Sequence, residues 1–263
     1  MDVRKSHQTG LHHGEADLSV VKFLNWNIQN PSLLRATKQV EWMTHYGFDV
    51  VILTETKLSE GCEYIRHSLE RLGYTVTFPH PNRQDYGVIL AVRELFEERL
   101  NTSTKFLSHR TCSVVCNFGR NTLVTAIYAP AWMNKKKTKF QDEFEKLVFI
   151  DNLRKKAYGW LIIGDLNVLE PGHVPVCLEY KPWEYLYTDL CKHGFVDAFR
   201  HFHPRKKEYS WFGHGGNGYR IDQILVTRSL LPFLQSCSYV HAPRLRKLSD
   251  HSAMILEMGW PIS

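Results

Sequence analysis

The segment WLIIGDLNV, residues 160–168, ends an apolar run with two polar side chains that could act together. Four consecutive apolar residues, Trp160 to Ile163, predict a short strand that is buried on both faces. Asp165 and Asn167 follow Gly164 at the carboxyl end of this strand, which is where open α/β sheets bind ligands. Residues two apart on an extended chain point the same way, so a carboxylate and an amide would face one place. A turn that closes the strand explains the same two residues, because Asp and Asn favour turns.

Polar residues also stand at the ends of other predicted strands. They are Asn27, Glu55, Tyr128, Asp222, Asp250 and His251, and Lys57 comes just after Glu55. Each has an ordinary explanation when taken alone: Asp250 could cap a turn, Glu55 could face solvent, and His251 could be a core histidine with its hydrogen bonds satisfied. Strand ends converge in space when two sheets pack together, so the whole set predicts a single site.

The chemistry of this set is that of phosphodiester hydrolysis. Glu55 with other carboxylates makes a hard oxygen site suited to Mg²⁺ or Mn²⁺, and no thiolate or multi-histidine spacing indicates zinc. His251 beside Asp250 offers a cation that could stabilise a phosphate oxygen, and Asp165 offers a base to orient water. Neutral hydrogen-bond donors complete the set: Asn27, Asn167 and Tyr128.

The surrounding pattern predicts many strands, with helices in two groups. The predicted helices cover residues 33–46, 60–72, 140–153 and 182–193. The predicted strands cover 20–27, 49–54, 74–78, 88–92, 113–118, 123–128, 160–163, 209–212, 221–226, 238–241 and 253–258, with a further candidate at 105–108. This order indicates two sheets packed face to face and flanked by helices. Residues 1–18 are polar and are predicted to be a disordered tail, and residues 19–263 to be a single domain.

Composition limits the classes of protein that fit. The chain has 263 residues, of which 43% are hydrophobic and 23% charged, as in soluble globular proteins. Its net charge of +6 suits an anionic partner such as nucleic acid, although many soluble proteins reach that charge without one. The cluster Lys135, Lys136, Lys137 and Lys139 fits either a solvated helix start or a contact with backbone phosphate.

The sequence also bears on location. No apolar run approaches the length of a membrane span, and the N-terminus lacks the apolar region of a signal peptide. The six cysteines form no CxxC pair and mostly lie in apolar stretches, so they are predicted to be reduced core thiols. We therefore expect an intracellular protein, cytoplasmic, or nuclear if the organism is a eukaryote, with no membrane association and no obligate protein partner.

Nine short motifs occur along the chain in an order and spacing that resemble those of a known protein family. They are NWNI, TETK, DYGVIL, IYAP, GDLNV, GFVDAFRHFHP, YSWF, GYRID and SDH. In this order and spacing the chain resembles the endonuclease/exonuclease/phosphatase superfamily, and within it the exonuclease III-type abasic-site endonucleases, over nearly all of residues 20–258. The resemblance implies an α/β fold, a four-layer α/β/β/α sandwich of two packed mixed β-sheets flanked by helices. It also implies a site at one end of the two sheets.

The resemblance implies a role for each matching residue around the metal. Glu55 would be the divalent-metal ligand with Asn27 beside it, and Asp250 would lie near the metal as a direct or water-mediated ligand. Asp165 would orient or deprotonate the attacking water, and Asn167 would help to hold the phosphate.

Further roles follow for the phosphate and the sugar. His251 would contact the phosphate as an imidazolium paired with Asp222, and Tyr128 would donate to the scissile phosphate. The residues expected to bind the rest of the substrate are Asn27, Lys57, Trp211, Tyr219 and Ile221, of which the last three would line a pocket for an extrahelical abasic sugar. Ordinary core packing is the alternative role for Trp211 and Tyr219.

The chain departs from the family pattern in three places. The loop after Asn27 is remodelled over residues 29–35, Ala131 stands where nuclease members often have Asn, and Thr54 replaces the usual Gln before the metal-binding Glu. These changes leave the chemistry intact, and they leave the substrate preference and the rate open.

We therefore expect a divalent-metal-dependent DNA phosphodiesterase that uses Mg²⁺ or Mn²⁺. Its expected substrate is the phosphodiester 5′ to an abasic site in duplex DNA, with 3′-to-5′ exonuclease or 3′-phosphatase activity as additional possibilities, in DNA repair. Within enzymes, the alternatives are a less selective DNase or RNase, or a small-molecule phosphoesterase of the same superfamily. Outside enzymes, the alternative is a nucleic-acid-binding module that has lost catalysis.

Overall fold

The computed structural model describes residues 18–82, 84–93, 97–131, 135–149 and 157–261. The predicted tail therefore lies outside the described residues, except for Leu18, which begins the first strand. The first part of the chain contains β1 (Leu18–Asn27), α1 (Leu33–Tyr46), β2 (Val50–Thr56), α2 (Glu60–Arg71), β3 (Tyr74–Thr77), β4 (Gly87–Arg93), β5 (Glu97–Thr102), η2 (Ser108–Arg110), β6 (Thr111–Asn117), β7 (Asn121–Tyr128) and α3 (Lys135–Phe149).

The second part continues with shorter elements. These are β8 (Gly159–Asp165), η3 (Lys181–Trp183), α5 (Glu184–Lys192), β9 (Phe195–Asp197), α6 (Ala198–Phe202), β10 (Trp211–Phe212), β11 (Gly218–Tyr219), β12 (Asp222–Thr227), η4 (Arg228–Phe233), β13 (Leu234–Val240), α7 (Ala242–Leu245) and β14 (Ala253–Pro261). None of the described helices is long and apolar enough to cross a membrane.

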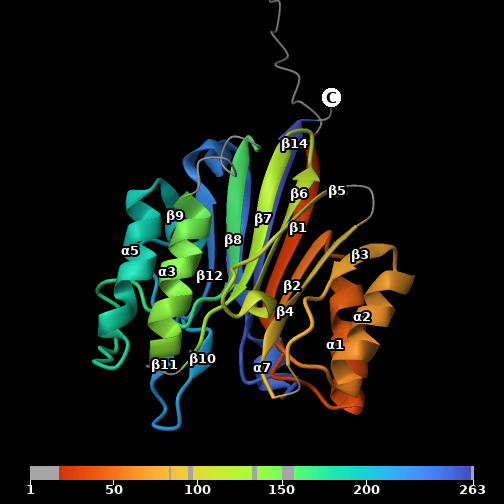
Figure 1. Ribbon diagram of the computed structural model, residues 1–263, viewed down its shortest axis with the longest axis horizontal. Coiled ribbons are helices and arrows are strands. Elements are labelled where there is room, and N and C mark those ends of the chain that lie inside the picture. The colour runs from red at the N-terminus through yellow and green to blue at the C-terminus, as the bar shows by residue number, and fades with distance from the viewer. Residues whose placement is uncertain (1–17, 83, 94–96, 132–134, 150–156, 262–263) are drawn as a thin grey trace, which may run out of the picture.

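The strands form two mixed six-stranded sheets. The first sheet has the order β13-β14-β1-β2-β4-β3 and the second β5-β6-β7-β8-β12-β9. Each contains one parallel pair among antiparallel ones, β1 with β2 and β7 with β8. Figure 1 shows the two sheets face to face, with α1 and α2 outside the first sheet and α3 and α5 outside the second. The expected four-layer α/β/β/α sandwich is confirmed.

Three apolar clusters fill the spaces between the four layers. On β8, Leu161 and Ile163 pack between the sheets, whereas Trp160 and Ile162 pack against the side of α3 and α5. On β1, Phe23 packs between the sheets and Leu24 packs toward α1 and α2. This alternation explains why the central strands have continuous apolar runs, since both of their faces are covered.

Most predicted elements agree with the structure within a few residues, and the candidate strand at 105–108 is wrong. Leu107 has a left-handed backbone (φ 53) and begins the short helix η2, so the segment turns instead of pairing. The edge strand is β5, at residues 97–102, which the apolar pattern did not indicate. The strands β9, β10 and β11 have only two or three residues, which is too short for hydrophobic periodicity to define their ends. The predicted strand 209–212 overlaps β10, which covers only Trp211–Phe212.

A polar side chain crosses the space between the two sheets. Asn25 lies on the inward face of β1, two residues after Phe23, and is fully buried. Its Nδ2 donates to the backbone oxygens of Gly164 (3.1 Å) and Gln223 (3.4 Å) on the second sheet. These bonds fasten the two sheets to each other beside the strand ends where the polar residues gather.

We expect Asn25→Ala to destabilise the fold. The substitution removes two hydrogen bonds made by a fully buried side chain, which costs about 1–3 kcal/mol in free energy of unfolding. Urea denaturation measures this change. Asn121→Ala, at an exposed position that begins β7, is the matched control and should lie within about 0.5 kcal/mol of wild type. Equal stabilities of the two variants would contradict a fastening role for Asn25.

Candidate active site

The predicted polar residues lie together at one end of the sandwich, opposite the end where Leu18 pairs with Pro261. The strand register explains much of this arrangement. Asp165 pairs with Tyr128 on β7 and with Asp222 on β12, so these three residues stand side by side across the second sheet. Asn27 and Glu55 come from the ends of β1 and β2 on the first sheet. His251 comes from the loop before β14.

Two of these residues have unusual backbone conformations. Glu55 (φ 55) and Asn167 (φ 49) both adopt the left-handed region, which is uncommon for residues other than glycine. The pairing of β2 with β4 shifts register at Glu55, between Thr54 and Thr56, as a β-bulge does, and such bulges re-aim a side chain. Strained backbone of this kind clusters at functional sites.

A glycine lets the central strands approach closely. A Cβ atom on Gly164 would lie 1.8 Å from the backbone oxygen of Ile127, so any other residue there would displace β8 from β7. Gly164 therefore fixes the position of Asp165, the next residue.

Hydrogen bonds join residues from the two sheets. Asn27 Nδ2 donates to Asp165 Oδ2 (3.1 Å), and the Tyr128 hydroxyl donates to Glu55 Oε1 (3.1 Å). The backbone N–H of Asn167 donates to Asp165 Oδ1 (2.9 Å), and its side-chain Nδ2 donates to the oxygen of Ala129 (2.9 Å). Both carboxylate oxygens of Asp165 are thus held in place.

His251 and Asp222 form a buried ion pair. His251 Nδ1 lies 2.7 Å from Asp222 Oδ2, and the two side chains are 4% and 0% exposed. Burial alone would lower the pKa of His251, but Asp222 outweighs burial and raises this pKa to about 10. The imidazolium is therefore the stable form near neutral pH. The Tyr239 hydroxyl donates to the backbone oxygen of Asp222 (2.5 Å) and holds the start of β12.

Acidic groups crowd the centre of the site. One carboxylate oxygen each from Glu55 and Asp165 and one ring nitrogen of His251 lie within 4.8 Å of one another. Burial, followed by the negative charges of Asp222 and Glu55, raises the pKa of Asp165 well above its usual range, although His251 acts in the opposite direction. A cation between Glu55 and Asp165 would relieve this repulsion, so the donor set fits Mg²⁺ or Mn²⁺.

Comparison with known proteins agrees with this arrangement. The model of the endonuclease/exonuclease/phosphatase family matches residues 24–251. The chain belongs to this family. No curated protein sequence matches it.

Several solved structures share the fold over nearly their whole length. A 3′ phosphatase from Neisseria, bound to a product DNA hairpin, has a TM-score of 0.75 at 18% identity, covering 91% of this chain and 100% of its own. An AP endonuclease from Archaeoglobus fulgidus has a TM-score of 0.74 at 22% identity, covering 90% and 98%. An AP endonuclease from Leishmania major has a TM-score of 0.72 at 18% identity, covering 92% and 88%. At these identities the likeness establishes the fold.

The aromatic residues predicted for the sugar pocket form a row beside His251. Trp211 and Tyr219 face each other across the pair β10 and β11, with ring centroids 5.9 Å apart, and Trp211 also stacks on His251 at 6.1 Å. Both aromatic side chains are half-buried, whereas Ile221 is 3% exposed. Trp211 Nε1 donates to Asp250 Oδ2 (3.1 Å), so that carboxylate lies at the edge of the row.

Lys57 lies elsewhere, next to Tyr86. Its Nζ is 4.1 Å from the ring centroid of Tyr86, and Tyr86 in turn meets the ring of Tyr128 edge-on at 6.2 Å. The site therefore has a cationic flank at Lys57 and an aromatic flank at Trp211. Of the metal ligands expected from the sequence, Glu55 lies in the group with Asp165 and His251. Asn27 Oδ1 accepts the N–H of Gln29 (3.0 Å), and Asp250 is exposed.

Sequence reasoning missed a buried charge cluster behind the site. The fully buried Arg220 lies 2.7 Å from both Glu170 and Asp197, and Arg200 also pairs with Glu170. Burial would raise the pKa of Glu170, but Arg200 and Arg220 lower it to about 2. This cluster ties the loop after β8 to the strand that carries Asp222. The GYRID motif contains Arg220, but only its partners explain its burial.

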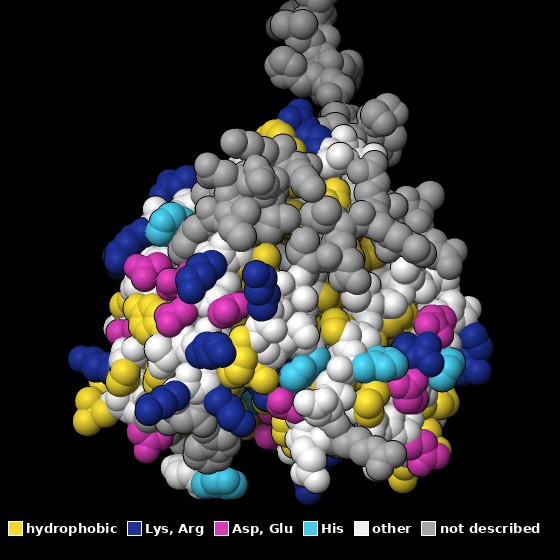
Figure 2. Space-filling model, viewed as in Figure 1, with side chains coloured by type: hydrophobic (Ala, Val, Ile, Leu, Met, Phe, Trp, Pro, Cys, Tyr) yellow, Lys and Arg dark blue, Asp and Glu magenta, His cyan; other side chains and the backbone are white. Residues whose placement is uncertain are grey.

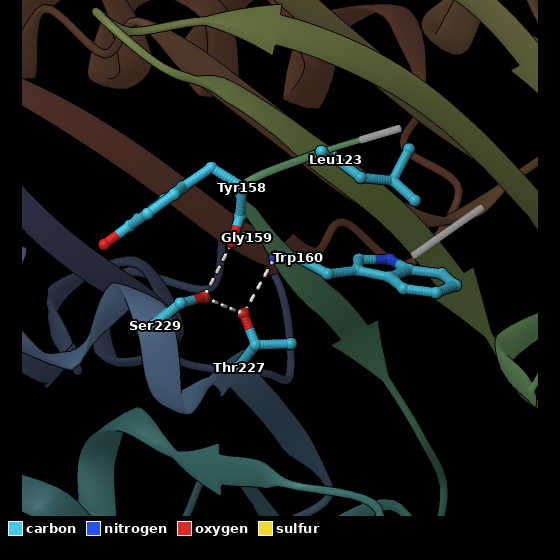
Figure 3. A pocket seen from close by; sticks show the side chains of 7 residues that line it. Leu123, Tyr158, Gly159, Trp160, Thr227 and Ser229 are labelled. Atoms are coloured by element: carbon cyan, nitrogen blue, oxygen red, sulfur yellow. Dashed lines mark hydrogen bonds between the residues drawn. The ribbon is translucent and has the colours of Figure 1, made fainter. Parts of the chain in front are cut away.

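Surface features away from the site offer less chemistry. On the face in Figure 2, Lys and Arg side chains over α3 and α5 alternate with Asp and Glu, so the net positive charge is not gathered there. A hollow of about 110 Å³ lies at the start of β8. Tyr158, Thr227 and Ser229 are among the residues that line it (Figure 3). Ser229 donates to the oxygen of Tyr158 (2.9 Å), and Thr227 accepts from the Trp160 N–H (3.0 Å), so these polar groups satisfy one another.

We expect the His251–Asp222 pair to make stability depend on pH. The pKa of His251 is raised from 6.5 to about 10 in the folded protein, so its stabilisation is fully present below about pH 6.5 and is lost as pH rises through 10. The stability difference between wild type and Asp222→Asn should therefore shrink between these pH values. Urea unfolding in EDTA measures it, with Asp142→Asn on the exposed face of α3 as the control. A difference that stays constant with pH would contradict the ion pair.

Proposed function

We propose that this protein is a divalent-metal-dependent phosphodiesterase that cleaves DNA 5′ to abasic sites. The observation that carries the proposal is the convergence of three groups from two sheets: the Asp165 carboxylate, the His251 imidazolium and the Glu55 carboxylate, all within 4.8 Å. A proton acceptor, a cation and a metal-binding oxygen at one point are the requirements for hydrolysing a phosphate diester.

In the proposed mechanism, Asp165 orients a water for in-line attack on phosphorus and takes its proton. The P–O3′ bond on the opposite side breaks, and the leaving 3′ oxygen takes up a proton from solvent to become a 3′-hydroxyl, while the phosphate stays on the abasic sugar. Asn27 and the N–H of Asn167 hold the carboxylate in position for this step. His251 neutralises charge on a phosphate oxygen, and Asp222 keeps its imidazole charged.

Other groups complete the proposed site. With substrate bound, Tyr128 would turn its one hydroxyl proton from Glu55 Oε1 to the scissile phosphate, and Asn167 would contact the same phosphate. Glu55 would hold the Mg²⁺ or Mn²⁺, with Asn27 beside it and Asp250 at the outer edge. A bound metal supplies Lewis-acid stabilisation of the developing negative charge.

The substrate assignment rests on the aromatic flank. An abasic sugar leaves the base stack at lower cost than an intact nucleotide, and a half-buried aromatic wall beside the phosphate site suits it. In the proposal Trp211 and Tyr219 form this wall, with Ile221 as the buried apolar member of the same set. Solved structures of the fold include two AP endonucleases and a 3′ phosphatase with product DNA, which supports DNA as the partner and 3′-end cleavage as a second activity of the same site.

Cleavage of matched duplexes, with and without one abasic analogue, tests the proposal directly. We expect Mg²⁺-dependent cutting at the abasic site, none in EDTA, and a loss of about 10²–10⁴-fold for Asp165→Asn because the base is removed. Asp142→Asn is the control and should cut at the wild-type rate. Near wild-type turnover of Asp165→Asn would assign water activation to another group, and no metal-dependent cutting by wild type would favour a module that only binds nucleic acid.

Lesion selectivity is tested at Trp211. We expect Trp211→Ala to open the pocket, so that cleavage of abasic duplex falls toward the rate on intact duplex while metal dependence is unchanged. Trp211→Phe keeps an aromatic wall but loses the hydrogen bond to Asp250, so it separates packing from bonding. The ratio of the two cleavage rates is the measurement, and Phe212→Ala, at the exposed neighbouring position, is the control. If wild type cuts both duplexes equally, the protein is a general nuclease and Trp211 is a packing residue.

A further inference from the structure

Lys137 is a fully buried lysine behind the active site. It lies in the first turn of α3, where the neighbouring Lys135, Lys136 and Lys139 are exposed and Lys137 alone is 0% exposed. Of the two explanations for this lysine cluster, a solvated helix start and a phosphate contact, neither describes Lys137, because no part of its side chain reaches solvent. A lysine is almost never fully buried without a partner.

Its partner is a backbone oxygen of the catalytic turn. Lys137 Nζ donates to the Asn167 carbonyl oxygen at 2.7 Å. Asn167 has the left-handed backbone (φ 49), and its own N–H donates to Asp165 Oδ1 at 2.9 Å. One peptide segment is therefore held at its carbonyl by Lys137 while its N–H holds the Asp165 carboxylate.

The ammonium is also enclosed by aromatic rings. Lys137 Nζ lies 5.4 Å from the ring centroid of Tyr180 and 5.2 Å from that of Trp183, within the range of cation–π attraction. Tyr180 then packs against Tyr219, at 5.8 Å between ring centroids. Lys137 thus contacts the turn at Asn167, which follows Asp165. It also contacts Tyr180, which packs against Tyr219 of the aromatic row.

We propose that Lys137 is a positioning residue for Asp165, holding the turn at Asn167 from the interior side so that the carboxylate faces the attacking water. The inference rests on the proposed role of Asp165 as the group that activates water. It assigns Lys137 no contact with DNA.

We expect Lys137 to lose its charge at mildly alkaline pH. Burial lowers the pKa of Lys137 to about 8, although Asp165, which faces it from the end of β8, acts in the opposite direction. Tyr180, on the other side, has a raised pKa and stays neutral there. Lys137 is therefore charged below about pH 8 and neutral above it, and a neutral amine is the weaker donor to the Asn167 oxygen.

The kinetic test uses Lys137→Met, which keeps the volume of the stem and removes the ammonium. On the abasic duplex in saturating Mg²⁺ we expect kcat to fall about 10–100-fold with KM within about twofold, because the turn is misplaced and binding is not. The alkaline loss of kcat near pH 8 in wild type should be absent in Lys137→Met. Lys135→Met, on the same turn and exposed, is the control and should match wild type in kcat and pH profile.

A second variant and a second readout keep the test decisive. Lys137→Arg keeps a donor that stays charged at high pH, so it should retain more activity than Lys137→Met and lack the alkaline loss. Independently of activity, hydrogen exchange at the Asn167 N–H should be at least about 10-fold faster in Lys137→Met, while exchange in the β1–β14 pair is unchanged.

Each contrary result has a distinct meaning. An unchanged kcat with raised KM and a weaker salt dependence would make Lys137 a phosphate contact and overturn the proposal. Unchanged exchange at Asn167 would also overturn it. Absence of metal-dependent cleavage by wild type would refute the proposed function alone, and the exchange measurement would still decide whether Lys137 holds the turn.

Discussion

The active site depends on how the two sheets are fastened to each other. Asn25 bonds from β1 to the backbones of β8 and β12, and close by Asn27 bonds to Asp165, Tyr128 to Glu55, and His251 to Asp222. The bonds of Asn25, Asn27 and Tyr128 run from one sheet to the other, and the bond of His251 joins the loop before β14 to β12 on the second sheet. The apolar layer between the sheets sets their separation, and these polar links set their alignment at one end. Neither sheet alone contains a complete set of groups for the proposed chemistry.

Burial of charge carries an energetic cost at this site. Ionised groups out of water are stable only when they are paired or bonded, and the structure pairs them on both sides of the site. Asp222 with His251 balances charge at the front, and Arg220 with Glu170 and Asp197 balances it behind. Asp165 is instead held by hydrogen bonds from Asn27 and Asn167, and burial together with the nearby Asp222 and Glu55 raises its pKa. A carboxylate left in this state is suited to receive a metal ion and a proton in turn.

The sequence predicted the polar residues that gather at the site better than it predicted the buried residues that hold them in place. Asp165 and Asn167 could be predicted because a buried strand, a glycine and a two-residue spacing are local features. Burial of Lys137 could not be predicted, since its neighbours have the same type and are exposed. Asn25 falls within the predicted strand 20–27, but its bonds to the second sheet could not be predicted, because nothing in the sequence distinguishes a polar residue that crosses between sheets from any other polar residue. The edge strand β5 was not predicted either, because its pairing with β6 defines it more than its own sequence pattern does.

Gly164 has a consequence for how this chain can vary. The backbone of β7 occupies the space that a side chain at position 164 would need, so every substitution there moves the strand that carries Asp165. Random mutagenesis should accordingly find no functional replacement at this position. The exposed glycines Gly215 and Gly216, by contrast, have open space around them, although Gly216 has a positive φ of 79. Diversification aimed at new substrates is therefore best confined to such surface loops, where the backbone can change without separating β7 from β8.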